Sequence, residues 1–164
     1  MPDVTCERLR KIIDYDPTTG VFRWHVSARG HRRAGAHAGC LDHKGYRRIG
    51  IDWRIYKAHR LAWLIMHGHW PDNEIDHIDG NRDNNAIVNL RLATSQQNAA
   101  NRQITRNNTS GFKGVVWHKG RRKWRAQIKL GGRYRHLGLY DTPELAAAAY
   151  AAATTNYNGE FARI

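Results

Sequence analysis

The sequence predicts an α+β protein in which short strands and single helices form two units. Three observations predict this fold class. Apolar and polar residues alternate in residues 46–57 and 112–140, which is the period of half-buried strands. Apolar residues follow a helical spacing in residues 57–68, and an alanine-rich run near residue 150 favours another helix.

The composition indicates a globular protein with a strong positive charge. The chain has 164 residues, enough for one ordinary domain or two small ones, and 41% of them are apolar. Lysine and arginine number 27 against 14 acidic residues, which gives a formal charge of +13, and ten histidines could add to it. Nucleic acid is therefore the first partner to consider.

Several other classes do not fit the sequence. No apolar run approaches the roughly 20 residues needed to span a membrane, and no stretch is a basic amphipathic helix, so we expect no membrane partner. The start "MPDVTCERLRKII" has charges where a secretory signal has apolar residues, so we expect an intracellular, non-secreted protein. Cys6 and Cys40 form no C-x-x-C pair, so we do not expect cysteine-ligated zinc.

The first 57 residues predict short helices and strands separated by turns and loops that contain Pro or Gly. "LRKIIDYDPTTGVFRW" predicts a short helix, a turn at residues 17–20 and a strand, because Pro and Gly interrupt the apolar pattern. "SARGHRRAGAHAG" is glycine-rich and basic, and either a solvated loop or a phosphate-contacting arm fits it. "GYRRIGIDWRIYKAHR" predicts a hairpin with its turn near residues 52–54.

A helix is predicted over residues 57–68. Gly68 and Pro71 end it. The helix carries His59 and His67, and His69 follows it, but His67 and His69 are two residues apart and do not share a helical face as i, i+4 ligands would. We therefore do not expect a histidine metal cluster here. The apolar spacing rests on Ala58, Leu61, Ala62 and Ile65.

The stretch "DHIDGNRDNNAIVNLRLATSQQN" concentrates amides and carboxylates that a core could not bury without partners. A unit of two strands and one helix would bring Asp76, His77, Asn89 and Asn98 together across one small concavity. The predicted elements are a strand at 74–78, a loop at 79–85, a strand at 87–92 and a helix at 94–102 opened by Thr94 or Ser95.

The segment "AHRLAWLIMHGHWPDNEIDHIDGNRDNNAIVNLRLATSQQNAANR" resembles the HNH endonuclease family, in particular phage and intron-encoded homing endonucleases with a ββα-metal fold. The resemblance covers residues 56–102, and its motif is D-H-I-D-G-N followed by N-N and N-L-R. "YDPTTGVFRW" and "GYRRIGI" are also similar to the N-terminal part of such phage enzymes.

The resemblance implies a role for each of four residues. Asp76 and Asn98 are expected to hold one divalent metal ion, Mg²⁺ or alternatively Mn²⁺. His77 is expected to be the general base that activates water, and Asn89 is expected to orient its imidazole through the other ring nitrogen. The loop residues Asp79, Asn81, Asp83, Asn84 and Asn85 are interpreted as turn and capping residues and are left out of the catalytic set.

Phosphodiester hydrolysis independently requires these residue types. Negative charge develops on the phosphate and the leaving oxygen, and a hard cation with oxygen ligands can neutralise it. One carboxylate and one amide leave coordination positions for phosphate and water. Histidine, with an ordinary pKa of about 6.5, is largely neutral slightly above pH 7 and can accept a proton there.

The polar bridge "NRQITRNNTSG" separates two parts of different composition. We expect a nuclease domain at 1–102, a linker at 103–110 and a second module at 111–164. In the module, three strands with turns at 119–122 and at Gly131-Gly132 precede a helix opened by Thr142 and Pro143, which should cover the apolar side of the sheet. Four large residues are interpreted as packing residues: Trp117, Trp124, Leu137 and Tyr150.

This module resembles the DNA-binding domain of plant ethylene-response factors, which lays a three-stranded sheet into the DNA major groove. The matching residues are "FKGVVWHKGRRKWRAQI", "RHLGLYDTPELAAAAYAAA" and "YNGEFARI". Val116 and His136 depart from common family residues, so the family's base preference is not transferred. The expected DNA-binding residues are Lys113, Arg125, Gln127, Lys129, Arg133 and Arg135.

The sequence thus favours a metal-dependent endonuclease of the HNH homing type that cuts or nicks double-stranded DNA. Because one HNH unit holds one active site, a monomer or weak dimer is expected, and a monomer would most simply nick. Two alternatives remain open: a DNA-binding transcriptional regulator with an inactive HNH unit, and an RNA-associated basic protein without catalysis.

Overall fold

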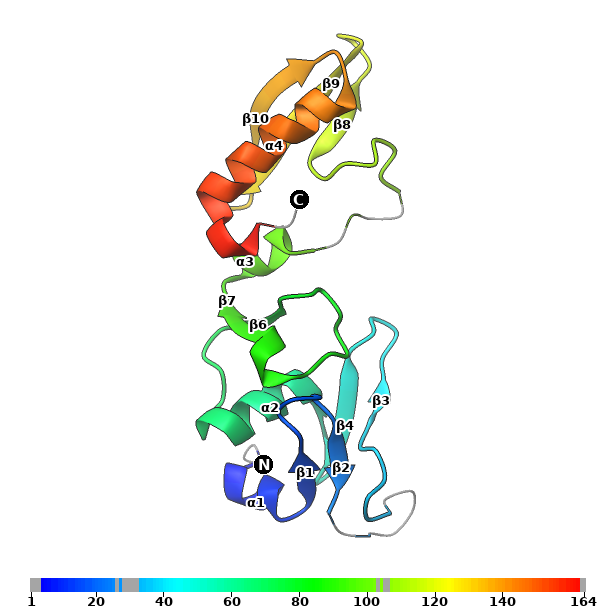
Figure 1. The fold of residues 1–164 in the computed structure, drawn as a ribbon, viewed down its shortest axis with the longest axis vertical. Coiled ribbons are helices and arrows are strands. Elements are labelled where there is room, and N and C mark those ends of the chain that lie inside the picture. The colour runs from blue at the N-terminus through cyan, green and yellow to red at the C-terminus, as the bar shows by residue number, and fades with distance from the viewer. Residues whose placement is uncertain (1–3, 26, 28–32, 103, 105–106, 163–164) are drawn as a thin grey trace. The chain divides into compact units, whose positions relative to one another are not determined.

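The computed structural model describes residues 4–25, 27, 33–102, 104 and 107–162 (Figure 1). The chain forms two compact units, residues 1–92 and residues 93–164, and each is described by itself. Parts of the expected basic arm and of the expected linker, residues 28–32, 103 and 105–106, lie outside the described residues.

The first unit is α+β, as the sequence predicts. Its small sheets have the strand orders β1-β2, β3-β4-β5 and β6-β7, and the first two are antiparallel. In chain order its elements are α1 (Cys6–Arg10), β1 (Ile13–Tyr15), β2 (Phe22–Trp24), β3 (Cys40–Leu41), β4 (Arg47–Ile51), β5 (Arg54–Lys57), α2 (Ala58–His67), β6 (Glu74–His77), the short 3₁₀ helix η1 (Ile87–Asn89) and β7 (Leu90–Ala93).

Local sequence signals fix the turns around α2. The β4–β5 hairpin turns at Asp52 and Trp53, whose φ angles of 46° and 64° are those of a tight hairpin turn. This confirms the predicted turn. The helix ends at Gly68, which has a φ of 79° and donates its N–H to the carbonyl of Leu64.

The core of the first unit joins the N-terminal elements to the hairpin and α2. Leu9, Phe22, Ile49 and Leu61 are each at most 1% exposed and belong to one cluster. Burying such a side chain contributes about 1.5–3 kcal/mol. The same cluster includes Ile75 of β6, so the strand that carries Asp76 and His77 is anchored in the core.

The second unit has a three-stranded antiparallel sheet of order β10-β9-β8, with a helix across one face (Figure 1). The helix starts as predicted, because the hydroxyl of Thr142 accepts from the N–H of Leu145 and Pro143 occupies the first turn. The elements are α3 (Ser95–Ala100), β8 (Val115–His118), β9 (Lys123–Leu130), β10 (Arg133–Tyr140), α4 (Pro143–Asn158) and the 3₁₀ helix η2 (Gly159–Phe161).

Aromatic packing shows how closely α4 approaches the sheet. Tyr150 of α4 is 7% exposed, and a Cβ on Gly114 would lie 2.1 Å from its ring, so the backbone before β8 requires glycine there. Trp124 and Leu137 pack against the small core of this unit, as expected. Trp117 differs from the expectation, because it is 45% exposed with its ring edge-on to Trp124 at 5.1 Å.

The two compact units divide between residues 92 and 93, and the expected domain bounds at 102 and 111 stay a prediction. Helix α3, expected to belong with residues 1–102, groups with the second unit. Helix α3 contacts α4 and η2 of this unit. The ammonium of Lys113 also donates to the carbonyl of Ala100, and the N–H of Gly131 donates to Oε1 of Gln96 at 3.0 Å. Separately, within the described part of the chain no helix has the length and apolar character required to cross a bilayer.

Candidate active site

Asp76 and His77 end strand β6 and are almost completely buried, with 3% and 4% of their surfaces exposed. Successive residues of a strand point to opposite sides, so the two side chains have different surroundings. Oδ2 of Asp76 accepts from Nε and Nη2 of Arg91, on β7, at 3.0 Å each. A buried carboxylate is thus held in place by a two-pronged contact with a guanidinium.

The ring of His77 lies in an aromatic and amide environment. Its Nε2 is 3.4 Å from Oδ1 of Asn85, and the ring of His59 stands edge-on at 5.0 Å between centroids. Burial lowers the pKa of His77, against the opposing effects of Asn85 and of the charges of Asp79 and Asp76. The imidazole is therefore neutral near pH 7.

His59, on α2, is the second buried imidazole of this cluster. It is 5% exposed, and burial lowers its pKa to about 3, with the charges of His77 and Lys57 acting in the same direction. The sequence placed His59 only among the histidines around α2. Its helical spacing on the apolar side of α2, next to Ala58 and Ala62, is the signal that could have indicated burial.

Asn85 was interpreted from the sequence as a turn or capping residue, but its side chain is fully buried beside His77. Its Nδ2 donates to the carbonyl of Asp83 at 2.9 Å, while Oδ1 faces His77. The hydroxyl of Tyr15 donates to the carbonyl of Asn85 at 2.8 Å. Burial, with a smaller contribution from the charge of Asp16, raises the pKa of Tyr15 to about 12, so this donor stays protonated.

The N-terminal turn braces the same loop. The N–H of Ile87 donates to the carbonyl of Pro17 at 2.9 Å, and Gly20, with a φ of 73°, packs directly against the backbone of Asn85 and Ala86. The stretch "YDPTTG", which the sequence marked as a turn, therefore positions the loop that contacts His77.

Asn89 lies at the end of η1 and is 8% exposed. Its Oδ1 accepts from the N–H of Asp79 at 3.0 Å, and its Nδ2 donates to Oδ1 of Asp79 at 3.0 Å and to the carbonyl of Asn84 at 2.8 Å. These contacts close the loop after His77. Nε2 of the imidazole lies near Oδ1 of Asn85, and direct orientation of the ring by Asn89 stays a prediction.

Asp79 is held as an ionised carboxylate inside this loop. Partial burial raises its pKa, but hydrogen bonds from the Asn84 side chain, the Asn81 N–H and the Asn89 side chain outweigh that effect, so the pKa is lowered overall. The loop thus adds a fixed negative charge near His77.

Asn98 is the fourth residue of α3, in the second unit. The helix opens with a capping box at Thr94, which confirms one of the two expected start residues, and the N–H of Asn98 donates to the carbonyl of Thr94 at 2.9 Å. Because Asp76 and Asn98 belong to different units, their joint binding of a metal ion stays a prediction.

The donor types fit a hard divalent cation. Asp76 offers a buried carboxylate and Asn98 an amide oxygen, which are the ligands that Mg²⁺ and Mn²⁺ take in proteins. Within the described ranges, no group of three or more histidine, cysteine, aspartate or glutamate side chains could hold a metal ion. A metal ion bound by Asp76 would therefore need the Asn98 amide, water and the DNA phosphate as its further ligands.

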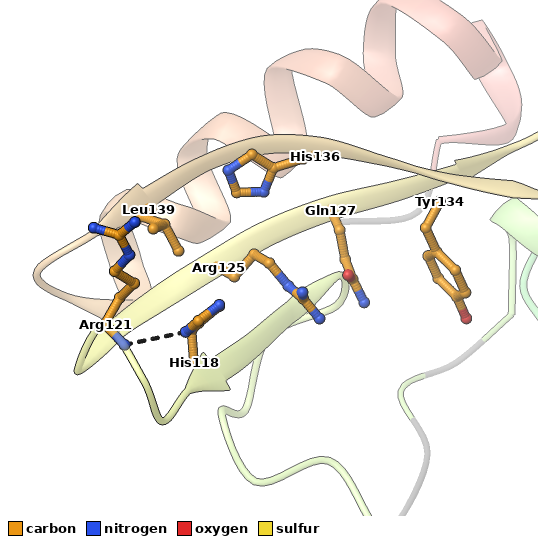
Figure 2. A pocket seen from close by; sticks show the side chains of 7 residues that line it. All are labelled: His118, Arg121, Arg125, Gln127, Tyr134, His136 and Leu139. Atoms are coloured by element: carbon orange, nitrogen blue, oxygen red, sulfur yellow. Dashed lines mark hydrogen bonds between the residues drawn. The ribbon is translucent and has the colours of Figure 1, made fainter.

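In the second unit, the register of β9 separates an apolar face from a polar face. Ala126 and Ile128 are at most 3% exposed on the side of α4, so Arg125, Gln127 and Lys129 point the other way. Figure 2 shows the hollow on this open face, and the N–H of Arg121 donates to Nδ1 of His118 at its edge at 3.2 Å. The hollow measures about 310 Å³ and is lined by His118, Arg121, Arg125, Gln127, Tyr134, His136 and Leu139.

The pairing of β10 corrects the expected position of two arginines. Arg133 lies opposite Leu130 and Arg135 opposite Ile128, so both share the face of the helix and not the cationic face. Arg135 donates from Nη1 to the hydroxyl of Tyr157, on α4, at 2.7 Å.

The residues that β10 contributes to the open face are Tyr134 and His136. His136 lies opposite Gln127, and Tyr134 lies opposite Lys129, with the Lys129 ammonium 5.6 Å from the Tyr134 ring centre. The two-residue turn at Gly131-Gly132 already implies this register. Lys113, the remaining expected DNA-binding residue, precedes β8 and donates to the carbonyl of Ala100 in α3, and its role in DNA binding stays a prediction.

Comparison with known proteins identifies relatives of the chain. A family model described as HNH endonuclease matches residues 56–100, which include Asp76, His77, Asn89 and Asn98. Protein 3.8 of Escherichia phage T7 is 38% identical over 114 residues, which are 67% of this chain and 93% of that protein. The uncharacterized HNH endonuclease L560 of Acanthamoeba polyphaga mimivirus is 28% identical over 152 residues, 92% of this chain and 70% of that protein.

A third relative has a solved structure. The DNA endonuclease I-HmuI of Bacillus phage SP01 is 37% identical over 62 residues, 35% of this chain and 36% of that protein. A structure described as DNA binding and cleavage by the HNH homing endonuclease I-HmuI covers 90% of this chain and 85% of its own, at 20% identity and a TM-score of 0.42.

Proposed function

Since this chain belongs to the HNH endonuclease family, we propose that it is a metal-dependent endonuclease of the homing type that hydrolyses phosphodiester bonds in, or nicks, double-stranded DNA. The observation that carries the proposal is the pair of buried, consecutive side chains at the end of β6. Asp76 and His77 offer a carboxylate and a neutral imidazole within the matched segment.

His77 is the proposed general base. Because Oδ1 of Asn85 is an acceptor, the facing Nε2 carries the proton, and the neutral tautomer has its lone pair on Nδ1. Burial keeps that lone pair unprotonated near neutral pH by lowering the pKa of His77. The imidazole then takes the proton of a water molecule as that water attacks the phosphorus.

Asp76 and Asn98 are the proposed ligands of one divalent ion, Mg²⁺ or Mn²⁺. When bound, the ion would neutralise the charge that develops on the phosphate and on the leaving oxygen. Arg91 holds the Asp76 carboxylate at a fixed position through Oδ2 before any ion binds.

Asn89 and Asn85 are proposed as positioning residues. Asn89 ties the loop to the start of β7, and Asn85 contacts the imidazole from within that loop. Such supporting contacts fix the tautomer and the ring orientation without adding charge.

The second unit is proposed to bind duplex DNA as the ethylene-response-factor resemblance implies. Arg125, Gln127 and Lys129 support this, because they share one open sheet face and Arg125 and Gln127 line its hollow (Figure 2). The major groove, about 12 Å wide, admits β-strands whose side chains reach the base edges.

Incubating the full chain with supercoiled plasmid and Mg²⁺, Mn²⁺ or a chelator tests the proposal. We expect nicked or linear product with either metal and none with the chelator. Absence of cleavage with either metal, on plasmid and on genomic DNA, would contradict the nuclease and favour a DNA-binding regulator.

A further inference from the structure

Tyr46, immediately before β4, lies at the centre of a cluster beside the proposed catalytic base. Its ring centre is 6.0 Å from that of His77 and 5.4 Å from that of His59. Two cations lie over the same ring: Nζ of Lys57 at 4.2 Å and the guanidinium carbon of Arg82 at 5.0 Å from its centre.

Local hydrogen bonds hold this arrangement in place. The N–H of Tyr46 donates to Oδ1 of Asp42 at 3.0 Å, and the N–H of Asp42 donates to the carbonyl of Tyr46 at 2.8 Å. Nη1 of Arg82 donates to the carbonyl of Lys44 at 2.8 Å. The ring and both cations therefore come from three segments, the β3–β4 turn, the end of β5 and the loop after β6, that meet at one place.

The two cations are exposed and form no ion pair with a carboxylate among the described residues. Neither Lys57 nor Arg82 lies within 4.0 Å of a carboxylate among the described residues, whereas Arg47 pairs with Asp83 at 2.8 Å and Arg91 with Asp76. Like charges held near one ring repel each other unless an anion lies between or beside them. An aromatic face offsets part of that cost and limits the freedom of both side chains.

We propose that Lys57 and Arg82, held over Tyr46, bind backbone phosphates of the DNA strand being cut, next to the scissile phosphate. The inference rests on the proposed function, because the strand that lies beside Tyr46 is the cut strand only if the neighbouring His77 is the general base. It gives the first unit a DNA contact of its own, separate from the sheet of the second unit. The contact recognises phosphate and carries no sequence information.

The test is the salt dependence of DNA binding by the full chain in the presence of EDTA, where no cleavage occurs. Fluorescence anisotropy with a labelled duplex between 50 and 200 mM KCl gives the slope of log K against log salt. Lys57→Gln and Arg82→Gln should each reduce that slope by about 0.9, the value for one lost phosphate contact, and the double variant by about twice as much.

Two matched variants separate this contact from a general loss of charge or fold. Lys11 is an exposed residue at the C-terminal end of α1 in the same unit. Lys11→Gln therefore removes one charge away from Tyr46 and should leave the slope of log K against log salt unchanged. Lys57→Arg keeps the charge and should retain the wild-type slope. Circular dichroism should show that all five variants are folded, as expected for exposed side chains.

Each outcome bears on a different claim. A double variant with the wild-type slope, or a Lys11→Gln variant with an equal loss, would overturn the phosphate contact. Cleavage of plasmid by the wild-type chain with Mg²⁺ or Mn²⁺ is measured in parallel, and its absence would overturn the proposed function whatever the slopes show.

Discussion

Replacing Gly20 with alanine should destabilise the first unit and disturb the site from a distance. A Cβ at this position would lie 2.2 Å from the nitrogen of Ala86 and 2.3 Å from the carbonyl carbon of Asn85, both backbone atoms that a side-chain rotation cannot move aside. Gly20 also has a φ of 73°, in the left-handed region that a Cβ disfavours.

The magnitude follows from these two effects. The left-handed conformation costs a non-glycine residue about 1–2 kcal/mol, and forcing a methyl group into a packed site adds about 1–3 kcal/mol. Gly20→Ala should therefore lower the free energy of unfolding by about 2–5 kcal/mol. Gly45 is a matched control, because its φ is 83° and nothing lies within 4 Å of an added Cβ, so Gly45→Ala should show the conformational cost alone.

Urea denaturation followed by tryptophan fluorescence measures both changes, and plasmid cleavage well below the unfolding transition measures the effect on the site. Gly20→Ala should lose cleavage activity, because the displaced backbone carries Asn85 against His77, while Gly45→Ala should keep it. Equal loss of stability in the two variants, or full activity in a folded Gly20→Ala variant, would refute the reasoning.

Three further predictions concern single side chains. Asn85→Ala should slow cleavage about 10–100-fold with unchanged DNA affinity, as expected for a residue that orients a reacting group, and an unchanged single-turnover rate would argue against that role. Arg91→Met should lower the free energy of unfolding by about 3 kcal/mol, because it removes the cation that pairs with the buried carboxylate of Asp76. Added Mg²⁺ should recover part of this loss in thermal melts. A loss of stability that Mg²⁺ does not change would contradict Asp76 as a metal ligand. Arg125→Ala should weaken duplex binding by about 1–3 kcal/mol in a titration. Arg135→Ala removes a partner of Tyr157 on the helix side of the sheet and should weaken binding much less. The reverse order of the two effects would mean that the helix side of the sheet faces DNA.

Much of the fold follows from local signals in the sequence. Turn residues with positive φ at Asp52 and Trp53, the left-handed Gly68 and the Thr142-Pro143 helix start are short-range effects, and the structure confirms each of them. The alternation in β9 likewise predicts which of its residues face α4. These features need no knowledge of distant contacts.

The parts that sequence reasoning missed depend on contacts between distant segments. Asn85 has the composition signal of a turn residue, and only the approach of Tyr15 and Gly20 from the N-terminal turn buries it against His77. Arg133 and Arg135 were assigned by charge, although strand pairing sets their face.

The grouping of α3 with the second unit also depends on tertiary contacts. Helix α3 contacts α4 and η2 and bonds with Lys113 and the β9–β10 turn, none of which is local to the helix. Composition marks the polar bridge after the helix and carries no signal of these contacts, which join α3 to the compact unit of residues 93–164.

The most direct test of the central claim compares His77→Ala with the wild-type chain on supercoiled plasmid in Mg²⁺, with DNA affinity measured in parallel. We expect the variant to bind DNA nearly as well as the wild type and to leave the plasmid uncut, because His77 supplies the proton acceptor and other residues supply the DNA contacts. A folded His77→Ala variant that still nicks the plasmid at the wild-type rate would contradict the assignment of the general base.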